Sequence, residues 1–569
     1  MVARSQPRFL RVMAALALTG LVGLAANQMT AAADQPRPAR EPAGEAPAAV
    51  RPAPQAPATT PVRRPAVRAP GADRGAAERG LSAGRALAAQ VTVDGVLSHL
   101  RAFQNVADSS GHTRMSGPGQ GYPRSVAYVG KQLRGAGYRV TRQRFDYPYF
   151  EERHPTTFQR GAKTYRSPGD FQILSYAGSG TVEAPVVAVD VDLRPPRHST
   201  SGCETADFAH FPRGSVALLQ RGTCEFREKV RNAIAAHASA VIIFNQGTGT
   251  PAKNKDQFDA FGGTLQSAVT VPAISVSYAV GAELAKSARA RVRITTDTVA
   301  QSRTTENLIA ELPRSGGRTV MVGAHLDSVP EGPGINDNGS GSAAVLEVAL
   351  RYAELARSAR PANSVRFAWW GAEEFGLLGS AHYLEKLTAA QRRAIALYLN
   401  FDMIASPNYN LGVYDGDDSA KQTGASRGPA GSARIEKFFR EFLADRGQKS
   451  TPSGLDGRSD YASFADRGIP VGGMDTGAEG TKTAAEVAKF GGVSGVDYDP
   501  CYHQACDALT PPTAHPEAYR KLRKAYGSRL VGNVNVVPLD LISDAIATAV
   551  GRYAYDLSDV AGASSSPAP

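Results

Sequence analysis

Histidine and carboxylate side chains occur at four points of the sequence where they could bind a metal ion and hydrolyse a substrate. They are His325, the pair Glu373-Glu374, Asp402, and Asp337 within a glycine-rich stretch. Several unpaired carboxylates in one place repel one another and are costly to desolvate, and a bound multivalent cation allows them to stay ionised. Imidazole and carboxylate ligands without thiolates suit zinc, and suit manganese or magnesium less well.

The segments before these residues are predicted to be strands that would position them. Short apolar stretches directly precede His325, Glu373-Glu374 and Asp402. The strands are expected at residues 319–324, 364–370 and 395–401, with helices at 342–355 and 377–387. This alternation predicts an α/β fold, with a mixed, mostly parallel sheet and helices on both faces. Ligands bind beyond the carboxyl ends of such strands, so we expect these side chains to meet in one crevice.

Any one of these residues has a simpler interpretation. A lone histidine is more often packed or exposed to solvent, and Glu373-Glu374 alone could be a solvated turn. Glycines around Asp337 let the backbone turn tightly, so that its carboxylate can point at a metal ion. The combination predicts a metal centre, whereas no single member does.

The order and spacing of these residues resemble those of the secreted di-zinc aminopeptidases of peptidase family M28. Asp337 follows His325 by twelve residues, and Asp402 follows Glu374 by twenty-eight. The late motif Cys501-Tyr502-His503-Gln504-Ala505-Cys506 completes the set. The resemblance implies the zinc-exopeptidase fold and two Zn²⁺ ions per chain.

The resemblance also implies how the ligands are shared. One zinc ion would be bound by His325 and Asp402, and the other by Glu374 and His503. Asp337 would bridge the two ions, which together would lower the pKa of a water molecule and polarise the scissile carbonyl.

Three further residues receive roles from the same resemblance. Glu373 would be the catalytic base, which takes the proton of the water and delivers it to the leaving amine. Tyr502 would donate a hydrogen bond to the developing oxyanion. Asp327 would orient the imidazole ring of His325.

The expected substrate pocket contains Met403, Arg458 and Asp475. Arg458 would contact the bound substrate or product carboxylate, although an ion pair with Asp456 or Asp460 is the alternative. The family usually has an aromatic residue where this chain has Asp475. A carboxylate there should weaken the preference for Leu-like side chains and favour Lys or Arg at the substrate's N-terminal position.

The M28 resemblance covers residues 90–170 and 300–555, and a different module lies between the two parts. Residues 175–290 resemble a protease-associated (PA) domain, on the segments 202–208, 221–226 and 240–245. We expect a small, β-rich inserted domain. It would be a lid or substrate-access element, or only a folded spacer. The M28 domain itself is expected at residues 89–174 and 291–558.

The N-terminal segment has the composition of an exported chain. Residues 1–33 predict a cleaved signal peptide, because three arginines precede an apolar stretch that ends at Ala31-Ala32-Ala33. A permanent membrane anchor is the alternative, but the apolar stretch is short and is broken at Thr19-Gly20. Residues 34–88 are rich in proline and alanine, which predicts a disordered linker or a removable pro-segment.

Export would allow the four cysteines to pair. Three pairings are possible, and the local pairs Cys203–Cys224 and Cys501–Cys506 are the economical choice. Four buried free thiols are the alternative.

Charge and composition exclude other classes of protein. The formal net charge is +11, but the first 90 residues hold twelve arginines and five acidic residues, so the remainder is close to neutral. With no Lys/Arg-rich run between aromatic residues, we expect no nucleic-acid partner and no stable membrane association. The sequence thus predicts a secreted, monomeric zinc aminopeptidase that acts on peptide or protein N-termini. A carboxypeptidase, a glutaminyl cyclase or a non-catalytic peptide-binding ectodomain are the alternatives.

Overall fold

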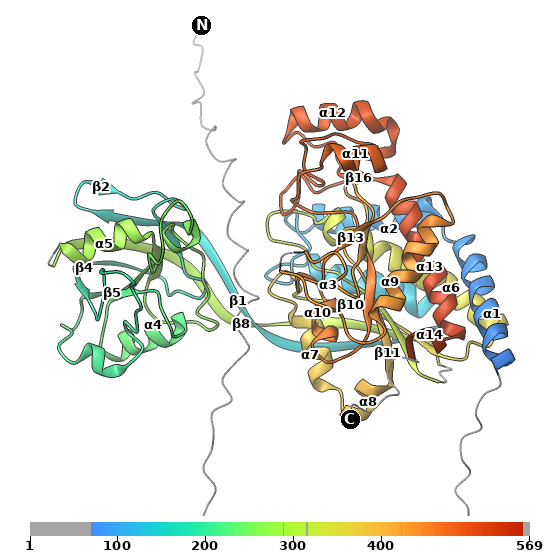
Figure 1. Cartoon of the computed structure of the whole chain (residues 1–569), viewed down its shortest axis with the longest axis horizontal. Coiled ribbons are helices and arrows are strands. Elements are labelled where there is room, and N and C mark those ends of the chain that lie inside the picture. Colours follow the sequence, from blue (N-terminus) through green and yellow to red (C-terminus); the bar gives the residue numbers. More distant parts are fainter. Residues whose placement is uncertain (1–69, 288, 314–316, 423, 562–569) are drawn as a thin grey trace, which may run out of the picture.

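A long two-stranded ribbon joins a large domain to a small one (Figure 1). The computed structural model describes residues 70–287, 289–313, 317–422 and 424–561. The ribbon consists of β1 (Arg139–Arg160) and β8 (Arg291–Glu311), which pair antiparallel over most of their length. No strand of this length is predicted from the sequence, so the ribbon is a finding of the structure.

The sheet of the large domain has the strand order β13-β12-β14-β11-β9-β10-β8, with β1 paired to β8. The strands β9, β10, β11 and β14 are mutually parallel, and β8 and β12 join them antiparallel. The mixed, mostly parallel α/β sheet is therefore confirmed. The strands are β9 (Thr319–His325), β10 (Ser364–Trp370), β11 (Ile395–Phe401), β12 (Gly412–Tyr414), β13 (Thr451–Ser453) and β14 (Val471–Asp475).

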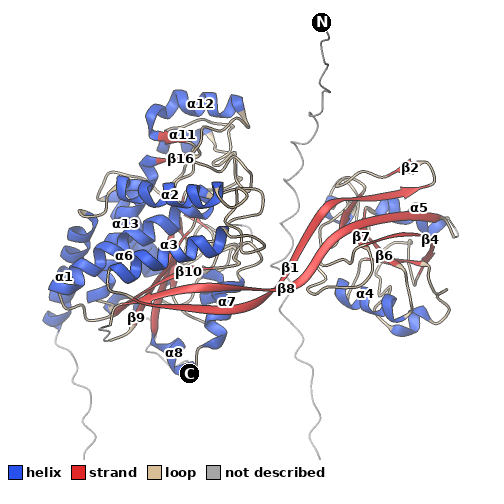
Figure 2. Cartoon of the chain, turned by 180° about the vertical axis from the view of Figure 1, so that it is seen from behind, coloured by secondary structure: helices blue, strands red, loops and turns tan. Residues whose placement is uncertain are grey.

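Helices cover both faces of this sheet because its central strands are apolar on both sides. Val322 of β9 belongs to the core on one face and Met321 to the core on the other. The first face packs against α1 (Pro70–Ala88), α2 (Val93–Asp108), α3 (Gly121–Gly135), α6 (Gly341–Ser358), α9 (Ser432–Ala444) and α13 (Val536–Tyr555). Figure 2 shows α1, α2, α3, α6 and α13 lying side by side. The other face packs against α7 (Leu378–Lys386) and α10 (Tyr461–Ala465).

Shorter elements complete the large domain. The side chain of Thr92 caps α2 by accepting a hydrogen bond from the backbone N–H of Gly95 at 3.1 Å, which fixes where that helix begins. The remaining elements are η3 (Ile335–Ser340), α8 (Ala389–Ala394), α11 (Ala484–Phe490), α12 (Pro516–Tyr526), η4 (Gly527–Arg529), β15 (Leu530–Val531), β16 (Val534–Asn535) and α14 (Ser558–Ala561).

The small domain has its own hydrophobic core, built around three buried parallel strands. The sequence places this module at residues 175–290, whereas Phe158, Tyr165 and Phe171 already belong to its core. The boundary therefore lies within the ribbon. The elements are β2 (Lys163–Thr164), β3 (Phe171–Ile173), β4 (Gly180–Ala188), η1 (Thr205–Phe208), β5 (Val216–Gln220), α4 (Phe226–Ala235), β6 (Ala240–Phe244), η2 (Lys255–Gln257), β7 (Ala273–Val276) and α5 (Tyr278–Lys286).

Both predicted disulfides are present. Cys203 and Cys224 form one in the small domain, and Cys501 and Cys506 form the other in the large domain. The predicted signal peptide and residues 34–69 lie outside the described residues. Within the part that the structure describes, no helix is both long enough and apolar enough to cross a bilayer.

The last part of the predicted linker is a helix. Composition assigns residues 34–88 to a disordered segment, but Pro70–Ala88 forms α1, which packs against α13. Glycines make this contact possible, because a Cβ atom at Gly84 would lie 2.4 Å from the carbonyl oxygen of Thr548. The alanine and glycine content, which predicts disorder, thus permits close packing of α1 against α13. Removal of a pro-segment as far as residue 88 would have to detach α1.

Substituting Gly84 should therefore destabilise the large domain. We expect Gly84→Val to lower the free energy of unfolding by about 1–3 kcal/mol, because the side chain collides with the backbone of α13. Gly75→Val is the matched control, since a Cβ atom there meets only the flexible end of Arg79. Thermal unfolding of the purified variants measures both. Equal melting temperatures for the two would show that α1 is not part of the folded domain.

Candidate metal centre

Five predicted residues from five different segments lie together at the carboxyl edge of the sheet. His325 is the last residue of β9, and Glu374 and Asp402 lie in the loops that follow β10 and β11. Asp337 lies in η3, directly before α6, and His503 lies within the Cys501–Cys506 disulfide loop. The parallel strands therefore bring residues far apart in the sequence to one place, as expected for side chains at the carboxyl ends of neighbouring strands.

Asp337 is the centre of this group, with one histidine at each of its carboxylate oxygens. Its Oδ1 lies 3.2 Å from Nε2 of His325, and its Oδ2 lies 3.1 Å from Nε2 of His503. Asp402 Oδ1 lies 3.2 Å from the same nitrogen of His325, and Glu374 Oε2 lies 3.2 Å from that of His503. The result is two clusters of three donor atoms that share Asp337.

The donor set fits a pair of zinc ions. Atoms that each bind one zinc ion at about 2.0–2.2 Å lie about 3–3.5 Å from one another, which is the spacing found within both clusters. Oε1 of Glu374 is buried and has no hydrogen-bond partner among the described residues. Buried carboxylate oxygens without a partner are costly unless a cation compensates them.

The charges of the group reflect the competition between burial and pairing. Burial raises the pKa of the Glu374 carboxyl to about 7, helped by the neighbouring Asp337 carboxylate. Burial would also raise the pKa of Asp337, but hydrogen bonds from His325 and His503 hold it well below its usual value. Burial alone would lower the pKa of His503, yet the carboxylates of Glu374 and Asp337 raise it to about 11. The site therefore combines concentrated negative charge with little access to water, which favours a bound cation.

Glu373 lies beside the first cluster without being part of the His325–Asp337–Asp402 group. Its Oε2 is 3.8 Å from Nε2 of His325, and only 8% of the residue is exposed. Burial raises its pKa well above the usual value, against the lowering effect of His325. A carboxylate with this raised pKa accepts a proton readily, which is the property of a general base.

Asp327 is held close to His325 and contacts the ring through its backbone. Nδ1 of His325 lies 3.1 Å from the backbone carbonyl oxygen of Asp327, whereas the carboxylate oxygen is 3.8 Å away. The carboxylate instead accepts a hydrogen bond from the backbone N–H of Glu373, at 3.2 Å. Asp327 thus connects the loop of His325 to the turn of Glu373.

The sequence did not reveal two residues that fix the candidate ligands. The Ser459 hydroxyl donates to Oδ2 of Asp402 at 2.6 Å. The carboxylate of Asp507 accepts the backbone N–H groups of Asn336 and Asp337, at 2.8 and 3.0 Å. Asp507 directly follows the disulfide loop of His503, and this proximity is the only sequence signal that points to it.

Tyr502 and Arg458 lie together beside the centre. The Tyr502 ring stacks on His503, and its hydroxyl lies 3.4 Å from Nη2 of Arg458. Arg458 forms an ion pair of 2.8 Å with Glu479, and not with Asp456 or Asp460 as the alternative predicts. Its backbone N–H nevertheless donates to Asp456 at 3.2 Å.

Met403 lies in the loop after β11, and Asp475 is the last residue of β14. These two strands are parallel neighbours in the sheet. Met403 is buried, at a backbone φ of 55°. Oδ1 of Asp475 accepts the backbone N–H of Gly477 at 3.0 Å. Its Oδ2 is buried without a hydrogen-bond partner among the described residues. Burial raises the pKa of this carboxyl.

Known proteins match both parts of the chain. The profile of Peptidase family M28 matches residues 307–524. An aminopeptidase of Pseudomonas aeruginosa is 44% identical over 418 residues, which cover 73% of this chain and 76% of that protein. The chain belongs to peptidase family M28. A probable lipoprotein aminopeptidase of Mycobacterium tuberculosis, another similar protein, is 39% identical over 83% of this chain and 87% of its own length.

The other comparisons agree with this M28 assignment. The PA domain profile matches residues 182–284, which confirms the predicted inserted domain. The structure of an aminopeptidase from Aneurinibacillus sp. strain AM-1 aligns with a TM-score of 0.56 and 23% identity, over 82% of this chain and 95% of that one. This likeness shows the shared fold. The chain is thus a metallo-aminopeptidase of family M28 with an inserted PA domain.

Proposed function

We propose that this M28 enzyme releases N-terminal residues from peptides and proteins with the help of two zinc ions. The position of Asp337 carries the proposal, because its two carboxylate oxygens face two separate histidine–carboxylate clusters. His325 and Asp402 would hold one ion, Glu374 and His503 would hold the other, and Asp337 would bridge them. When bound, such ions act as Lewis acids, which lower the pKa of a water molecule and polarise a carbonyl group.

The chain's own residues would move the proton and stabilise the developing charge. Glu373 takes a proton from the attacking water onto its carboxylate and then delivers it to the leaving amine, so that it ends the cycle ionised. The turn of Glu373 is held in place by the carboxylate of Asp327. The Tyr502 hydroxyl donates a hydrogen bond to the carbonyl oxygen as negative charge develops there.

The surrounding charge favours a free amino terminus. Three carboxylates and two histidines make up the two overlapping clusters, and the buried Glu373 lies beside them. Glu373 would not bind the ions, so its carboxylate keeps a negative charge there that attracts a cation, and the α-ammonium group of a peptide is one. An N-acylated peptide lacks it.

A panel of substrates with and without a free amino group tests this function. The purified enzyme should hydrolyse aminoacyl-p-nitroanilides, lose activity with a chelator and recover it with zinc. N-acetylated versions of the same substrates should be hydrolysed far more slowly. Equal rates on acetylated substrates, or full activity in the chelator, would contradict the proposal.

We also propose that Asp475 shifts the preference towards basic N-terminal residues. Asp475 is the last residue of β14, which pairs with β11, and Asp402 directly follows β11. Oδ2 of Asp475 has no hydrogen-bond partner among the described residues. A Lys or Arg side chain of the substrate could supply the missing donor. The substrate side chain would then donate a charge-assisted hydrogen bond to Asp475, which a Leu side chain cannot do.

Kinetics with Lys- and Leu-p-nitroanilide measure this preference. We expect Asp475→Asn to lower the Lys:Leu ratio of kcat/KM by about tenfold, corresponding to about 1.4 kcal/mol, and Asp475→Phe to lower it further. Asp417→Asn, on the loop after β12, removes a carboxylate elsewhere and should leave the ratio unchanged. An unchanged ratio in both Asp475 variants would remove this part of the proposal and leave the aminopeptidase function intact.

We further propose that the enzyme is exported. Its two disulfides are typical of an oxidising compartment. Residues 1–33, which carry the predicted signal peptide, would be removed on the way.

A further inference from the structure

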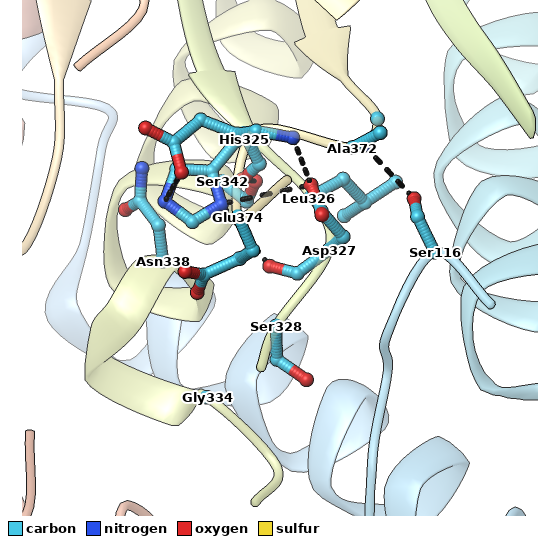
Figure 3. Close-up of polar contacts among 12 residues, drawn as sticks. Ser116, His325, Leu326, Asp327, Ser328, Gly334, Asn338, Ser342, Ala372 and Glu374 are labelled. Atoms are coloured by element: carbon cyan, nitrogen blue, oxygen red, sulfur yellow. Dashed lines mark hydrogen bonds and ion pairs between the residues drawn. The ribbon is translucent and has the colours of Figure 1, made fainter. Parts of the chain in front are cut away.

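The segment 113–116, between α2 and α3, contacts two of the loops that carry the candidate metal centre. Arg114 donates hydrogen bonds to the loop after β9 and to the start of the Asp337 segment. The Ser116 hydroxyl accepts the backbone N–H of Ala372 at 2.9 Å, directly before Glu373. A dashed line in Figure 3 joins Ser116 and Ala372. The function described above assigns no role to this segment.

Arg114 is the most deeply enclosed member of the segment, with no exposed surface. Its Nε donates to the carbonyl oxygen of Pro333 at 2.8 Å, its Nη1 to that of Leu326 at 2.5 Å, and its Nη2 to that of Gly334 at 2.5 Å. The guanidinium also lies over the ring of Phe103, 5.1 Å from its centroid. One planar group therefore ties together the two ends of the loop between β9 and η3.

The two ends of this loop adjoin ligands of the same cluster. Leu326 lies between His325 and Asp327, and Gly334 lies three residues before Asp337. The backbone leaves no room for adjustment at Gly334, where φ is 60° and a Cβ atom would lie 2.2 Å from the carbonyl oxygen of Asp337. A displacement of either end of the loop would change the separation of His325 and Asp337.

Neighbouring side chains hold Arg114 itself in place. Its backbone N–H donates to the Ser328 hydroxyl at 3.0 Å, and that hydroxyl donates to the carbonyl oxygen of Gly332 at 2.9 Å. The hydroxyl of Thr113 donates to the carbonyl oxygen of Val329 at 2.8 Å. The whole connection between residues 326 and 334 is thus bonded to the 113–116 segment.

We propose that Arg114 is a positioning residue of the metal centre, which sets the separation of His325 and Asp337 and thereby the metal affinity of the cluster they share. The inference rests on the proposed metal-dependent function. Arg114 acts through carbonyl groups at the two ends of this loop and touches neither substrate nor metal ligands directly. Residues that orient metal ligands from behind typically contribute a factor of about 10–100 in metal affinity or activity.

Charge alone is the competing explanation for Arg114, since it lies among several carboxylates. Lysine separates the two explanations, because it keeps the positive charge but lacks the rigid planar fork that reaches three carbonyl oxygens at once. If only the charge matters, Arg114→Lys should bind metal as the unsubstituted enzyme does. If the positions of the two loop ends matter, its zinc affinity should fall.

Competition between the enzyme and a chelator for zinc provides the measurement. We expect Arg114→Lys to bind the weaker of its two zinc ions at least ~10-fold less tightly than the unsubstituted enzyme. Arg552→Lys is the matched control, because Arg552 is also buried and donates to a backbone carbonyl, that of Asp556 at 2.8 Å, but it lies on α13. It should lose stability in the metal-free state and keep its metal affinity.

The outcomes separate the inference from the function on which it rests. Unchanged zinc affinity in Arg114→Lys, with a loss of metal-free stability like that of Arg552→Lys, would overturn the positioning role. Failure of the unsubstituted enzyme to bind two ions would instead overturn the proposed function. If Arg114→Lys does not fold, the zinc affinity of Ser328→Ala is measured in its place, and we expect it to be lower by about threefold or more. Unchanged affinity in that variant would equally overturn the role.

Discussion

Glu373→Gln is expected to lower kcat by about 10³-fold or more while the enzyme keeps its full metal content. Glutamine has the same shape but cannot accept the proton of the attacking water. Glu373 lies 3.8 Å from Nε2 of His325, just outside the spacing of about 3–3.5 Å that atoms sharing one zinc ion require. Steady-state kinetics and elemental analysis of the same preparation measure the two quantities.

The adjacent residue provides the control. Glu374→Gln should lose both turnover and metal, because Oε2 of Glu374 lies 3.2 Å from Nε2 of His503 within the second cluster. Two neighbouring, nearly identical substitutions should thus give opposite metal contents. Loss of metal in Glu373→Gln, with retention in Glu374→Gln, would mean that the base and the ligand are assigned the wrong way round.

Asp337→Asn is expected to weaken the binding of both zinc ions by about 100-fold or more. Asparagine keeps one oxygen donor but removes the negative charge and the second oxygen, and here each carboxylate oxygen faces a different histidine. Metal binding depends on deprotonated, correctly placed ligands, so a shared ligand should affect both ions. Zinc titration against a competing chelator measures the two affinities.

Asp402→Asn is the comparison for this substitution. Asp402 contacts only His325 of the two histidines, at 3.2 Å, so its loss should weaken one ion and leave the other in place. Asp337→Asn should therefore abolish the tighter site as well, while Asp402→Asn should not. If both variants lose a single ion, Asp337 is an ordinary ligand and does not bridge.

The central strands and their ends could be predicted because burial constrains their sequence so strongly. Residues 364–370 and 395–401 are predicted as strands and form β10 and β11 with the same bounds. Both lie in a parallel sheet covered on two faces, and such strands are apolar almost throughout. The polar residues that follow them must then lie at the carboxyl edge, where the structure brings His325, Glu374 and Asp402 together.

Other features follow from contacts that leave no local pattern. Arg114 is one arginine among many in the sequence, and its importance lies in three carbonyl oxygens more than 200 residues away. Helix α1 has the composition of a linker, and its close approach to α13 at Gly84 and the burial of Leu87 in the core explain why it is ordered. The ribbon pairs residues of β1 and β8 that lie 134 to 172 positions apart in the sequence, which a local sequence pattern cannot predict.

Anomalous diffraction at the zinc edge, from crystals of the zinc-loaded enzyme, tests the bridging role of Asp337 most directly. A bridging Asp337 predicts two peaks per chain, one between His325 and Asp402 and one between Glu374 and His503, with a carboxylate oxygen of Asp337 beside each. A single peak, or two peaks of which only one touches Asp337, would contradict it.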